Sequence, residues 1–205
     1  MKGVLICLEG IDGAGKNTQA EMLAKRLGSD MTIRKYSYPD YKSRYGKIIR
    51  EYLDKKIEME MDEFFFLQVL DKQKDRPSIE KQLMEGEVLI MDRYVYSHIA
   101  YESAGGFDYE AAKKIVEFSK MPSPDIVIYL DVAADVSMER KHKQHSGKLD
   151  RLEAMSSYLN KVREVYDKLH HERYGTGNWI KIDASKNPAE IHEEIYMEVC
   201  KLLGV

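Results

Sequence analysis

A glycine-rich loop between an apolar strand and an amphipathic helix constrains this chain more than any other feature. The strand pattern is VLICLE (residues 4–9), which is apolar on both faces, and helical periodicity runs over residues 16–27. Between them lies GIDGAG, followed by Lys16 and Asn17. A turn from strand to helix leaves several backbone N–H groups unpaired, and the helix dipole adds partial positive charge at the same point. The segment therefore predicts a loop that wraps around phosphate groups.

We expect this loop to hold the β and γ phosphates of ATP, with the Lys16 ammonium reaching both. The candidate ATP-binding residues in it are Gly10, Ile11, Asp12, Gly13, Ala14, Gly15, Lys16, Asn17 and Thr18. The strict motif has a magnesium-binding Ser or Thr where this chain has Asn17, and the side chain of Thr18 points about 100° further around the helix. We therefore expect Mg2+ to rely on carboxylates and water, with Asn17 as a weaker ligand. The alternative interpretation is an ordinary β–α turn with a solvated Lys16.

The rest of the chain alternates the same two patterns. Further runs that read as strands lie at 32–38, 88–92, 125–132 and, more weakly, 179–183. Further helical periodicity lies at 43–53, 61–84, 108–120, 152–172 and 188–203. Pro77 is expected to kink or split the helix over 61–84. Strands that are buried on both faces and separated by helices predict a three-layer α/β/α fold with a parallel sheet. We expect one domain over residues 1–205 because no linker or repeat interrupts the chain.

Composition narrows the classes of partner and compartment. The chain has 32 Lys and Arg against 35 Asp and Glu, a net charge of -3, whereas binding of a nucleic-acid polymer calls for a basic excess. Cys7 and Cys200 have no paired spacing, which favours a reducing, cytoplasmic setting. The first apolar run is too short for a signal peptide or a membrane span. We expect small anionic substrates, no nucleic-acid polymer and no membrane partner.

A second informative segment is EVLIMDRYVYSHIAY (residues 87–101), in which a strand ends at Asp92 and Arg93. Ligands of a parallel sheet gather at the carboxyl ends of its strands. Asp92 is therefore expected to face the same crevice as Lys16 and to hold magnesium through water, while Arg93 offers a forked donor suited to a phosphate. The alternative is a salt bridge of Asp92 at the end of the strand.

Basic residues cluster between the strand over 125–132 and the helix over 152–172. They are Arg140, Lys141, Lys143, Lys148 and Arg151. A glycine at position 147 interrupts the cluster, which is the layout of a lid, about 140–151, that closes cations over transferring phosphates. Arg140, Lys148 and Arg151 are the candidate catalytic residues of this lid. The alternative is a solvated charged surface.

Two aromatic segments have more than one interpretation. Tyr41 and Arg44 follow the strand over 32–38, where they either reach a phosphate or sugar or belong to a surface turn built on Pro39. The run Phe64 to Phe66 covers too wide an arc of a helix to be only core. Core packing, a dimer contact and base stacking are the three uses that it allows.

In combination these segments resemble the thymidylate kinase family of P-loop nucleoside monophosphate kinases, over nearly the whole chain. The motifs are LEGIDGAGKNTQ (8–19), YPDYKSRYGKII (38–49), LDKQKDR (70–76), DRYVYSHIAY (92–101), PSPDIVIYLDV (122–132), LDRLE (149–153) and VREVY (162–166). The resemblance implies a five-stranded parallel sheet of order 2-3-1-4-5. It also implies magnesium-dependent transfer of the γ-phosphoryl of ATP to dTMP, and a homodimer.

The resemblance implies roles for residues near the acceptor nucleotide. Asp12 would contact the sugar 3′-hydroxyl and help to organise the metal–phosphate region. Arg93, with Tyr41, would hold the dTMP phosphate. Tyr101 would lie against the deoxyribose and disfavour a 2′-hydroxyl. Lys72 falls where the family usually has an Arg that faces the thymine.

The remaining implied roles concern the base, the adenine and the lid. Ser97 and His98 would belong to the substrate site. The loop 183–185, with Ala184, would form the adenine pocket together with Arg140. Asp150 and Glu153 follow the lid, as in relatives in which acidic residues there lie near the metal or the sugar.

Three departures from the family pattern matter. Asn17 replaces the Ser or Thr, and His98 stands where a small or amide side chain is usual. Gln68 stands where the family usually has the Phe that stacks on thymine, so Phe65, Phe66 or Leu67 would have to substitute for it. Some members have an Arg at Gly13, and this chain would then take that positive charge from the lid.

Other functions fit parts of the same pattern. One is a kinase for another nucleotide or for a deoxynucleoside, and the other is a regulatory P-loop ATPase that hydrolyses ATP without an acceptor. A GTPase would carry an Asn-Lys-x-Asp guanine motif, which this sequence lacks.

Overall fold

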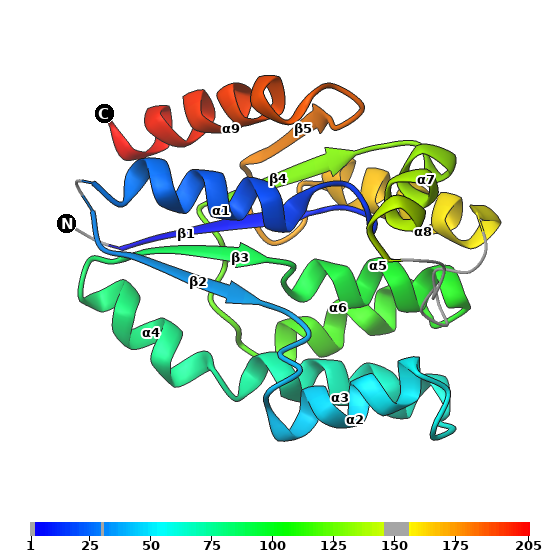
Figure 1. The fold of residues 1–205 in the computed structure, drawn as a ribbon. Coiled ribbons are helices and arrows are strands. Elements are labelled where there is room, and N and C mark those ends of the chain that lie inside the picture. The colour runs from blue at the N-terminus through cyan, green and yellow to red at the C-terminus, as the bar shows by residue number, and fades with distance from the viewer. Residues whose placement is uncertain (1–2, 30, 146–155) are drawn as a thin grey trace.

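Five parallel strands form the centre of the molecule (Figure 1). The computed structural model describes residues 3–29, 31–145 and 156–205, and of residues 141–145 only the backbone. The strands are β1 (Val4–Glu9), β2 (Ile33–Ser37), β3 (Val88–Asp92), β4 (Ile126–Asp131) and β5 (Trp179–Asp183). Their order is β2-β3-β1-β4-β5 and every pair is parallel. This confirms the order that the family resemblance implied.

Helices cover both faces of this sheet. They are α1 (Lys16–Leu27), α2 (Arg44–Leu53), α3 (Met61–Gln73), α4 (Arg76–Met84), α5 (Val95–Gly105), α6 (Tyr109–Phe118), α7 (Ala134–His145), α8 (Ser156–Glu172) and α9 (Pro188–Leu203). In Figure 1, α1 and α9 lie above the sheet, and α4, α3 and α6 lie below it. Contacts of α4 with β3 and of α8 with β4 and β5 close the second face. The predicted three-layer α/β/α fold is confirmed.

The burial of the strands follows from their sequence. Leu5, Ile6 and Leu8 of β1 are fully buried, as are Leu89 and Ile90 of β3, because helices cover both faces of a parallel sheet. The edge strand β2 has only half-buried and exposed positions, in line with its place at the edge of the sheet. The central strands therefore form a rigid base whose carboxyl ends lie along one edge of the sheet.

Pro77 splits the long helical segment in two. Helix α3 ends at Gln73, and α4 begins at Arg76 with Pro77 in its first turn, where the missing N–H costs nothing. Because the two helices are separate, α4 packs against β3 while α3 packs against α2 and α5. The break thus allows α3 to stand away from the sheet and to form the wall of a cleft.

The sequence pattern did not predict α5. Every residue from Val95 to Glu102 is buried, so the helix has no polar face to produce an amphipathic period. The sequence of a helix that is packed on all sides looks like an irregular apolar run. Its position matters, because α5 follows directly after the Asp92–Arg93 strand end and contacts α3, α6 and α8.

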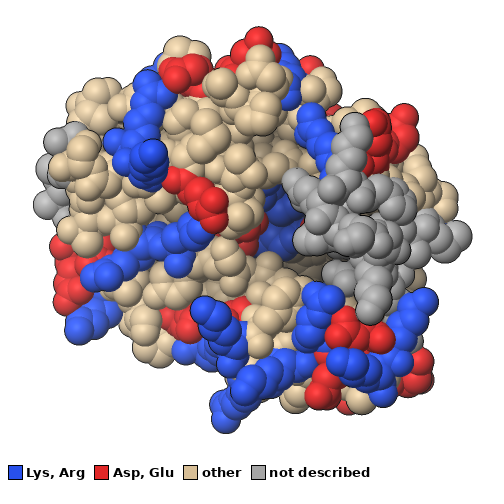
Figure 2. Space-filling view, in the orientation of Figure 1, with Lys and Arg blue, Asp and Glu red and all other residues tan. Residues whose placement is uncertain are grey.

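Charge is mixed over the surface. Figure 2 shows acidic and basic side chains interspersed on this face, with basic side chains also at the depth of a hollow near its centre. None of the helices within 3–29, 31–145 and 156–205 has the length and apolar character that crossing a bilayer requires. Cys7 and Cys200 are both free thiols, and Cys7 is buried in β1 as expected of a small core residue.

Candidate active site

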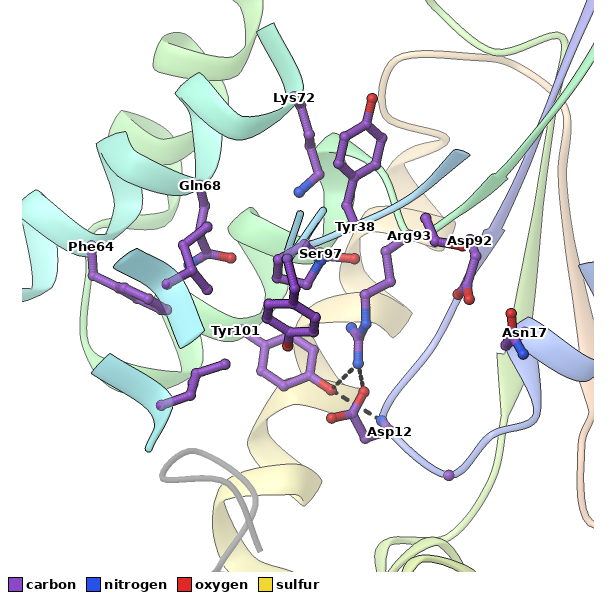
Figure 3. Close-up of a pocket in the computed structure, with 16 residues that line it drawn as sticks. Asp12, Asn17, Tyr38, Phe64, Gln68, Lys72, Asp92, Arg93, Ser97 and Tyr101 are labelled. Carbon is purple, nitrogen blue, oxygen red and sulfur yellow. Dashed lines mark hydrogen bonds and ion pairs between the residues drawn. The ribbon is translucent and has the colours of Figure 1, made fainter. Parts of the chain in front are cut away.

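A cleft opens at the carboxyl ends of β1 and β3. It consists of two adjoining cavities of about 370 Å³ and 300 Å³. Both are lined by Asp12, Gly13, Asn17, Asp92 and Arg93, so they form one continuous space. We call the part beside the Gly10–Lys16 loop the loop end, and the part beside Phe64, Gln68 and Lys72 the α3 end. Figure 3 shows the side chains that line the larger cavity.

Glycines set the path of the loop. Gly10 and Gly13 have φ angles of 140° and 76°, which other residues rarely adopt. A Cβ atom at Gly13 would stand 2.6 Å from the Ser137 carbonyl oxygen, and one at Gly10 would stand 2.4 Å from that of Leu130. Because the Gly13 backbone packs this closely on α7, an Arg at that position does not fit without a shift of α7.

Lys16 lies across the loop. Its Nζ donates hydrogen bonds to the carbonyl oxygens of Gly10, at 3.0 Å, and Ile11, at 2.7 Å, and stands 3.8 Å from the Asp12 carboxylate. Burial lowers the pKa of the ammonium, while the charges of Asp92 and Glu9 act in the opposite direction. Within the described part of the chain, this buried cation is held by two carbonyl oxygens and a distant carboxylate, which leaves it well placed to bind an anion.

Oxygen ligands for a hard cation face the loop end. The Asp92 carboxylate and the Asn17 amide line the same cavity as Lys16 and lie on the same side of Arg93 (Figure 3). Burial raises the pKa of Asp92, and Lys16 opposes this. The Asn17 Nδ2 donates to Glu21 Oε1 at 3.1 Å, which leaves the Asn17 carbonyl oxygen as the free end of the amide. Thr18 also lines the loop end.

Arg93, Asp12 and Tyr101 form a compact triangle at the centre of the cleft. The Arg93 guanidinium makes an ion pair with Asp12 and donates to the Tyr101 hydroxyl at 3.0 Å. The backbone N–H of Asp12 donates to the same hydroxyl at 3.0 Å. Because Arg93 comes from the end of β3 and Asp12 from the loop, the triangle joins the two strand ends predicted to share a crevice.

A buried carboxylate that the sequence analysis missed supports this triangle. Glu9 is fully buried, and its carboxylate accepts hydrogen bonds from the Tyr94 N–H at 2.7 Å, the Ser97 hydroxyl at 2.6 Å and the Tyr166 hydroxyl at 2.8 Å. These bonds fasten the first turn of α5, and with it Arg93, to the end of β1. The available signal was an acidic residue directly after a fully apolar strand.

The α3 end has an aromatic wall, formed by one residue of the run for which base stacking was one of three uses left open. Phe64 lines the larger cavity and packs on Tyr52, with ring centroids 4.3 Å apart. Phe65 belongs to the main core, and Phe66 is exposed. The run therefore divides into one cavity residue, one core residue and one surface residue. Phe64 lies one helical turn before Gln68, a spacing that was the available signal.

Lys72 is the cation of the α3 end. It is buried, lines the cavity, and its Nζ stands 4.8 Å from the centroid of the Tyr38 ring. Burial lowers the pKa of Lys72 to about 8, and the neighbouring Asp71 opposes this. Lys72 therefore changes its charge close to the physiological range.

Gln68 is bonded to two residues of α5. Its Nε2 donates to Glu102 Oε1 at 2.7 Å, and its Oε1 lies 3.3 Å from His98 Nδ1. His98 is fully buried and lies behind Gln68, so this predicted substrate residue reaches the cleft through the Gln68 amide.

Two other predicted substrate residues line the larger cavity. Tyr41 is 39% exposed, with the Arg50 guanidinium 5.3 Å from its ring centroid. Ser97 lines the cavity too, although its hydroxyl proton is donated to Glu9. The Tyr41 N–H donates to the Pro39 carbonyl oxygen at 3.1 Å, and the Arg44 guanidinium lies 4.6 Å from the Tyr45 ring centroid.

Arg140 is engaged away from the cleft. Its guanidinium donates to the carbonyl oxygens of Ala184, at 2.8 Å, and Ser185, at 3.3 Å. Ala184 is buried, and its N–H donates to the Asp131 carbonyl at 2.7 Å. Arg140 therefore braces the loop after β5. The other predicted lid residues, Lys148, Asp150, Arg151 and Glu153, lie outside the described residues.

Comparison with known proteins agrees with this geometry. A family model described as thymidylate kinase matches residues 8–195. The probable thymidylate kinase of Methanocaldococcus jannaschii is 36% identical over 194 residues, which cover 94% of this chain and 93% of that protein. The probable thymidylate kinase of Archaeoglobus fulgidus is 35% identical, with coverage of 94% and 92%, and the thymidylate kinase of Halothermothrix orenii is 34% identical, with 97% of each chain covered. The chain therefore belongs to the thymidylate kinase family.

Proposed function

We propose that this protein transfers the γ-phosphoryl group of ATP to dTMP and releases ADP and dTDP. The observation that carries the proposal is the cleft that places Lys16 and Arg93 on either side of Asp12. Two cations in one cleft suit a donor phosphate chain and an acceptor phosphate that must meet in line. Membership of the thymidylate kinase family supports both substrates.

The loop end is the proposed donor site. Backbone N–H groups of residues 12–17 and the Lys16 ammonium bind the β and γ phosphates. The hard oxygen donors of Asp92, Asn17 and Asp12 fit Mg2+, which keeps several waters and is shared between few carboxylates and substrate phosphates. No group of three His, Cys, Asp or Glu suited to a metal occurs among the residues that the structure describes. Bound magnesium would neutralise phosphate charge as the donor bond lengthens.

The α3 end and the central triangle are the proposed acceptor site. The Arg93 guanidinium binds the dTMP phosphate, with Tyr41 as a second contact. Asp12 accepts from the sugar 3′-hydroxyl. The Tyr101 ring lies against the deoxyribose, where it leaves no room for a 2′-hydroxyl. Ser97, His98 and Lys72 belong to the base end of this site, with His98 acting through Gln68.

The chemical step needs little beyond positioning. An oxygen of the acceptor phosphate attacks the γ-phosphorus, the bond from that phosphorus to the bridging β-γ oxygen breaks, and ADP leaves with the electron pair. The attacking phosphate oxygen carries negative charge, so no general base is required. Lys16 and Arg93 hold the two phosphates and stabilise the charge between them. Lys148 and Arg151 are proposed to add charge from a lid over about 140–151 and to exclude water.

Several further assignments accompany this proposal. Ala184 and its loop, braced by Arg140, are assigned to the adenine. The whole chain, 1–205, is assigned to a single kinase domain in the cytoplasm. A homodimer is proposed through α3, on which Phe66 and Leu70 are 49% and 41% exposed. Light scattering on the purified protein tests the dimer, and the variant Phe66→Ser is expected to weaken it.

A coupled assay tests the function itself. ADP formation from ATP and Mg2+ is followed with and without dTMP, and the nucleotide product is identified by chromatography. We expect ADP to form only with dTMP and dTDP to appear in equal amount. ADP without an acceptor would indicate a regulatory ATPase, and turnover with a different acceptor alone would indicate another nucleotide kinase. Either result contradicts the proposal.

A further inference from the structure

The α3 end contains a buried polar group that phosphate transfer does not use. Gln68, on the cavity wall, lies between Glu102 and His98, which are one turn apart on α5. Glu102 is 4% exposed and His98 is fully buried. Buried polar side chains that are paired in this way specify one arrangement, because leaving any of them unpaired is costly.

The two neighbours fix the direction of the Gln68 amide. A charged carboxylate only accepts hydrogen bonds, so Glu102 faces the amide nitrogen, at 2.7 Å. The amide oxygen then faces His98 Nδ1, at 3.3 Å, which must carry the proton. His98 Nε2 is buried with no hydrogen-bond partner among the described residues, which suits a nitrogen without a proton better than an N–H. Glu102 and His98 therefore hold the amide in the same direction.

An amide held by two neighbours keeps one N–H and one carbonyl lone pair for a ligand. Such a pair binds a base edge in two hydrogen bonds, as Asn and Gln do on adenine. A 4-keto pyrimidine offers a ring N–H beside a carbonyl, whereas a 4-amino pyrimidine offers a ring nitrogen acceptor beside an amine. The two edges require opposite directions of the amide.

We propose that Gln68 determines specificity for a 4-keto pyrimidine in the acceptor nucleotide, and that Glu102 and His98 are the positioning residues that fix its amide. The proposal rests on the proposed function and deepens it. In the fixed direction the amide oxygen accepts from the ring N–H of the base, and the amide nitrogen donates to its keto oxygen. Lys72, a donor on the same cavity wall, favours the same edge. Phe64 supplies the aromatic surface one turn earlier.

Protonation of Glu102 would remove one of the two constraints. Burial raises the pKa of Glu102 to about 7, and the hydrogen bond from Gln68 opposes this. The neighbouring groups are Tyr158 of α8 beside Glu102, and Lys72 of α3 and Arg93 beside His98. Burial and these two cations lower the pKa of His98 well below its usual value, so the ring stays neutral while Glu102 titrates. A neutral Glu102 donates as well as accepts, and the amide direction is then set by His98 alone.

The test compares dUMP with dCMP, which differ only in the keto or amino edge. The measured quantity is kcat/KM for dUMP divided by kcat/KM for dCMP. Changes in phosphate charge and general losses of stability affect both values and therefore cancel in this ratio. At pH 8 the wild-type ratio should favour dUMP, and Glu102→Gln should lower it about tenfold, since a glutamine faces the amide equally well in both directions. Between pH 8 and pH 6 the protonation of Lys72 acts on both enzymes, so the wild-type ratio should fall relative to that of Glu102→Gln, which lacks the titrating carboxyl.

Two further variants complete the test. Gln68→Met keeps the length of the side chain and removes the amide, so it should lower the ratio at every pH. In the double variant, Glu102→Gln should then have no further effect on the ratio. Glu190→Gln, an exposed change on α9, should leave the ratio unchanged. The inference is overturned if the wild-type enzyme phosphorylates dTMP and neither Glu102→Gln nor Gln68→Met changes the ratio of dUMP to dCMP. That result leaves the proposed function standing. A wild-type enzyme that phosphorylates no pyrimidine nucleotide overturns the proposed function first.

Discussion

The two ends of the cleft are built from different parts of the fold. At the loop end, Lys16 stands on the loop after β1 and Asp92 ends β3, and Asp12 and Arg93 of the central triangle come from the same two strand ends. At the α3 end, Phe64, Gln68 and Lys72 come from one helix that packs against α5 instead of the sheet. The central strands are buried on both faces, while α3 has an exposed side with Phe66 and Leu70.

This difference assigns different tasks to the two ends. Groups on strand ends are held by the most buried part of the molecule, which suits the precise placement that phosphoryl transfer needs. A helix wall tolerates changes of side chain, which suits selection among bases. The departures at Gln68 and His98 fall at the α3 end, in agreement with this division. Changes at the loop end should therefore affect turnover, and changes at the α3 end should affect the choice and KM of the acceptor.

The largest expected effect is that of Lys16→Ala. Loss of the cation that reaches the β and γ phosphates should lower kcat by roughly 10²–10³-fold, the size seen when one preorganised donor is removed. Steady-state kinetics with saturating dTMP measures this. Lys25→Ala, an exposed change in the last turn of the same helix, is the matched control. Near-normal turnover in Lys16→Ala, or a changed order of preferred acceptors, would contradict the division between the ends.

Arg93→Ala should affect the acceptor more than the donor. We expect kcat/KM for dTMP to fall by about 100-fold, because a forked, charged contact is lost and Asp12 loses one of its ion pairs. The KM for ATP should change less than threefold. Arg93→Lys retains the charge without the fork and should recover only part of the loss. Equal losses toward ATP and dTMP would show that Arg93 serves the donor side as well.

Lys72 gives the α3 end its own pH dependence. Because burial lowers its pKa to about 8, the ammonium loses its proton as the pH rises from 7 to 9. The KM for dTMP should rise up to about tenfold over this range. Lys72→Arg remains charged throughout, so its KM should stay flat. If the KM of the wild-type enzyme and that of Lys72→Arg depend on pH in the same way, Lys72 is not the titrating group. The pH dependence of kcat serves as the internal control for the loop end.

The same contrast explains which parts of the fold and the site could be predicted from the sequence. The strand, loop and helix that form the loop end were predicted because glycine spacing, an apolar strand and an amphipathic helix are local signals. The order of the strands came from the family resemblance and was confirmed. Glu9 was missed because its partners, Tyr94, Ser97 and Tyr166, are brought to it by α5 and α8. No local pattern records such contacts.

The α3 end was predicted less well for a related reason. Lys72 and Gln68 were identified by their motif position, but Phe64 was not distinguished from Phe65 and Phe66 because the aromatic run leaves the rotation of α3 undetermined. Packing of α3 on α2 and α5 fixes that rotation, with Phe65 against Phe107 at 4.8 Å and Phe64 against Tyr52. The pairing of Gln68 with Glu102 depends on α5, a helix whose uniform burial hid it from the pattern.

The smallest expected effect concerns Asn17, the one departure at the loop end. Asn17→Thr supplies a hydroxyl oxygen at the position from which the Asn17 amide now bonds to Glu21. Mg2+ prefers compact oxygen ligands at short distances, so the concentration of Mg2+ for half-maximal activity should fall about threefold, with saturated kcat and the choice among acceptors unchanged. A titration of activity with Mg2+ at fixed ATP measures this. Asn17→Ala should raise the same concentration by a similar factor. An unchanged titration in both variants would mean that residue 17 takes no part in holding the metal, which would leave Asp92 and Asp12 with water and substrate phosphates as its only ligands.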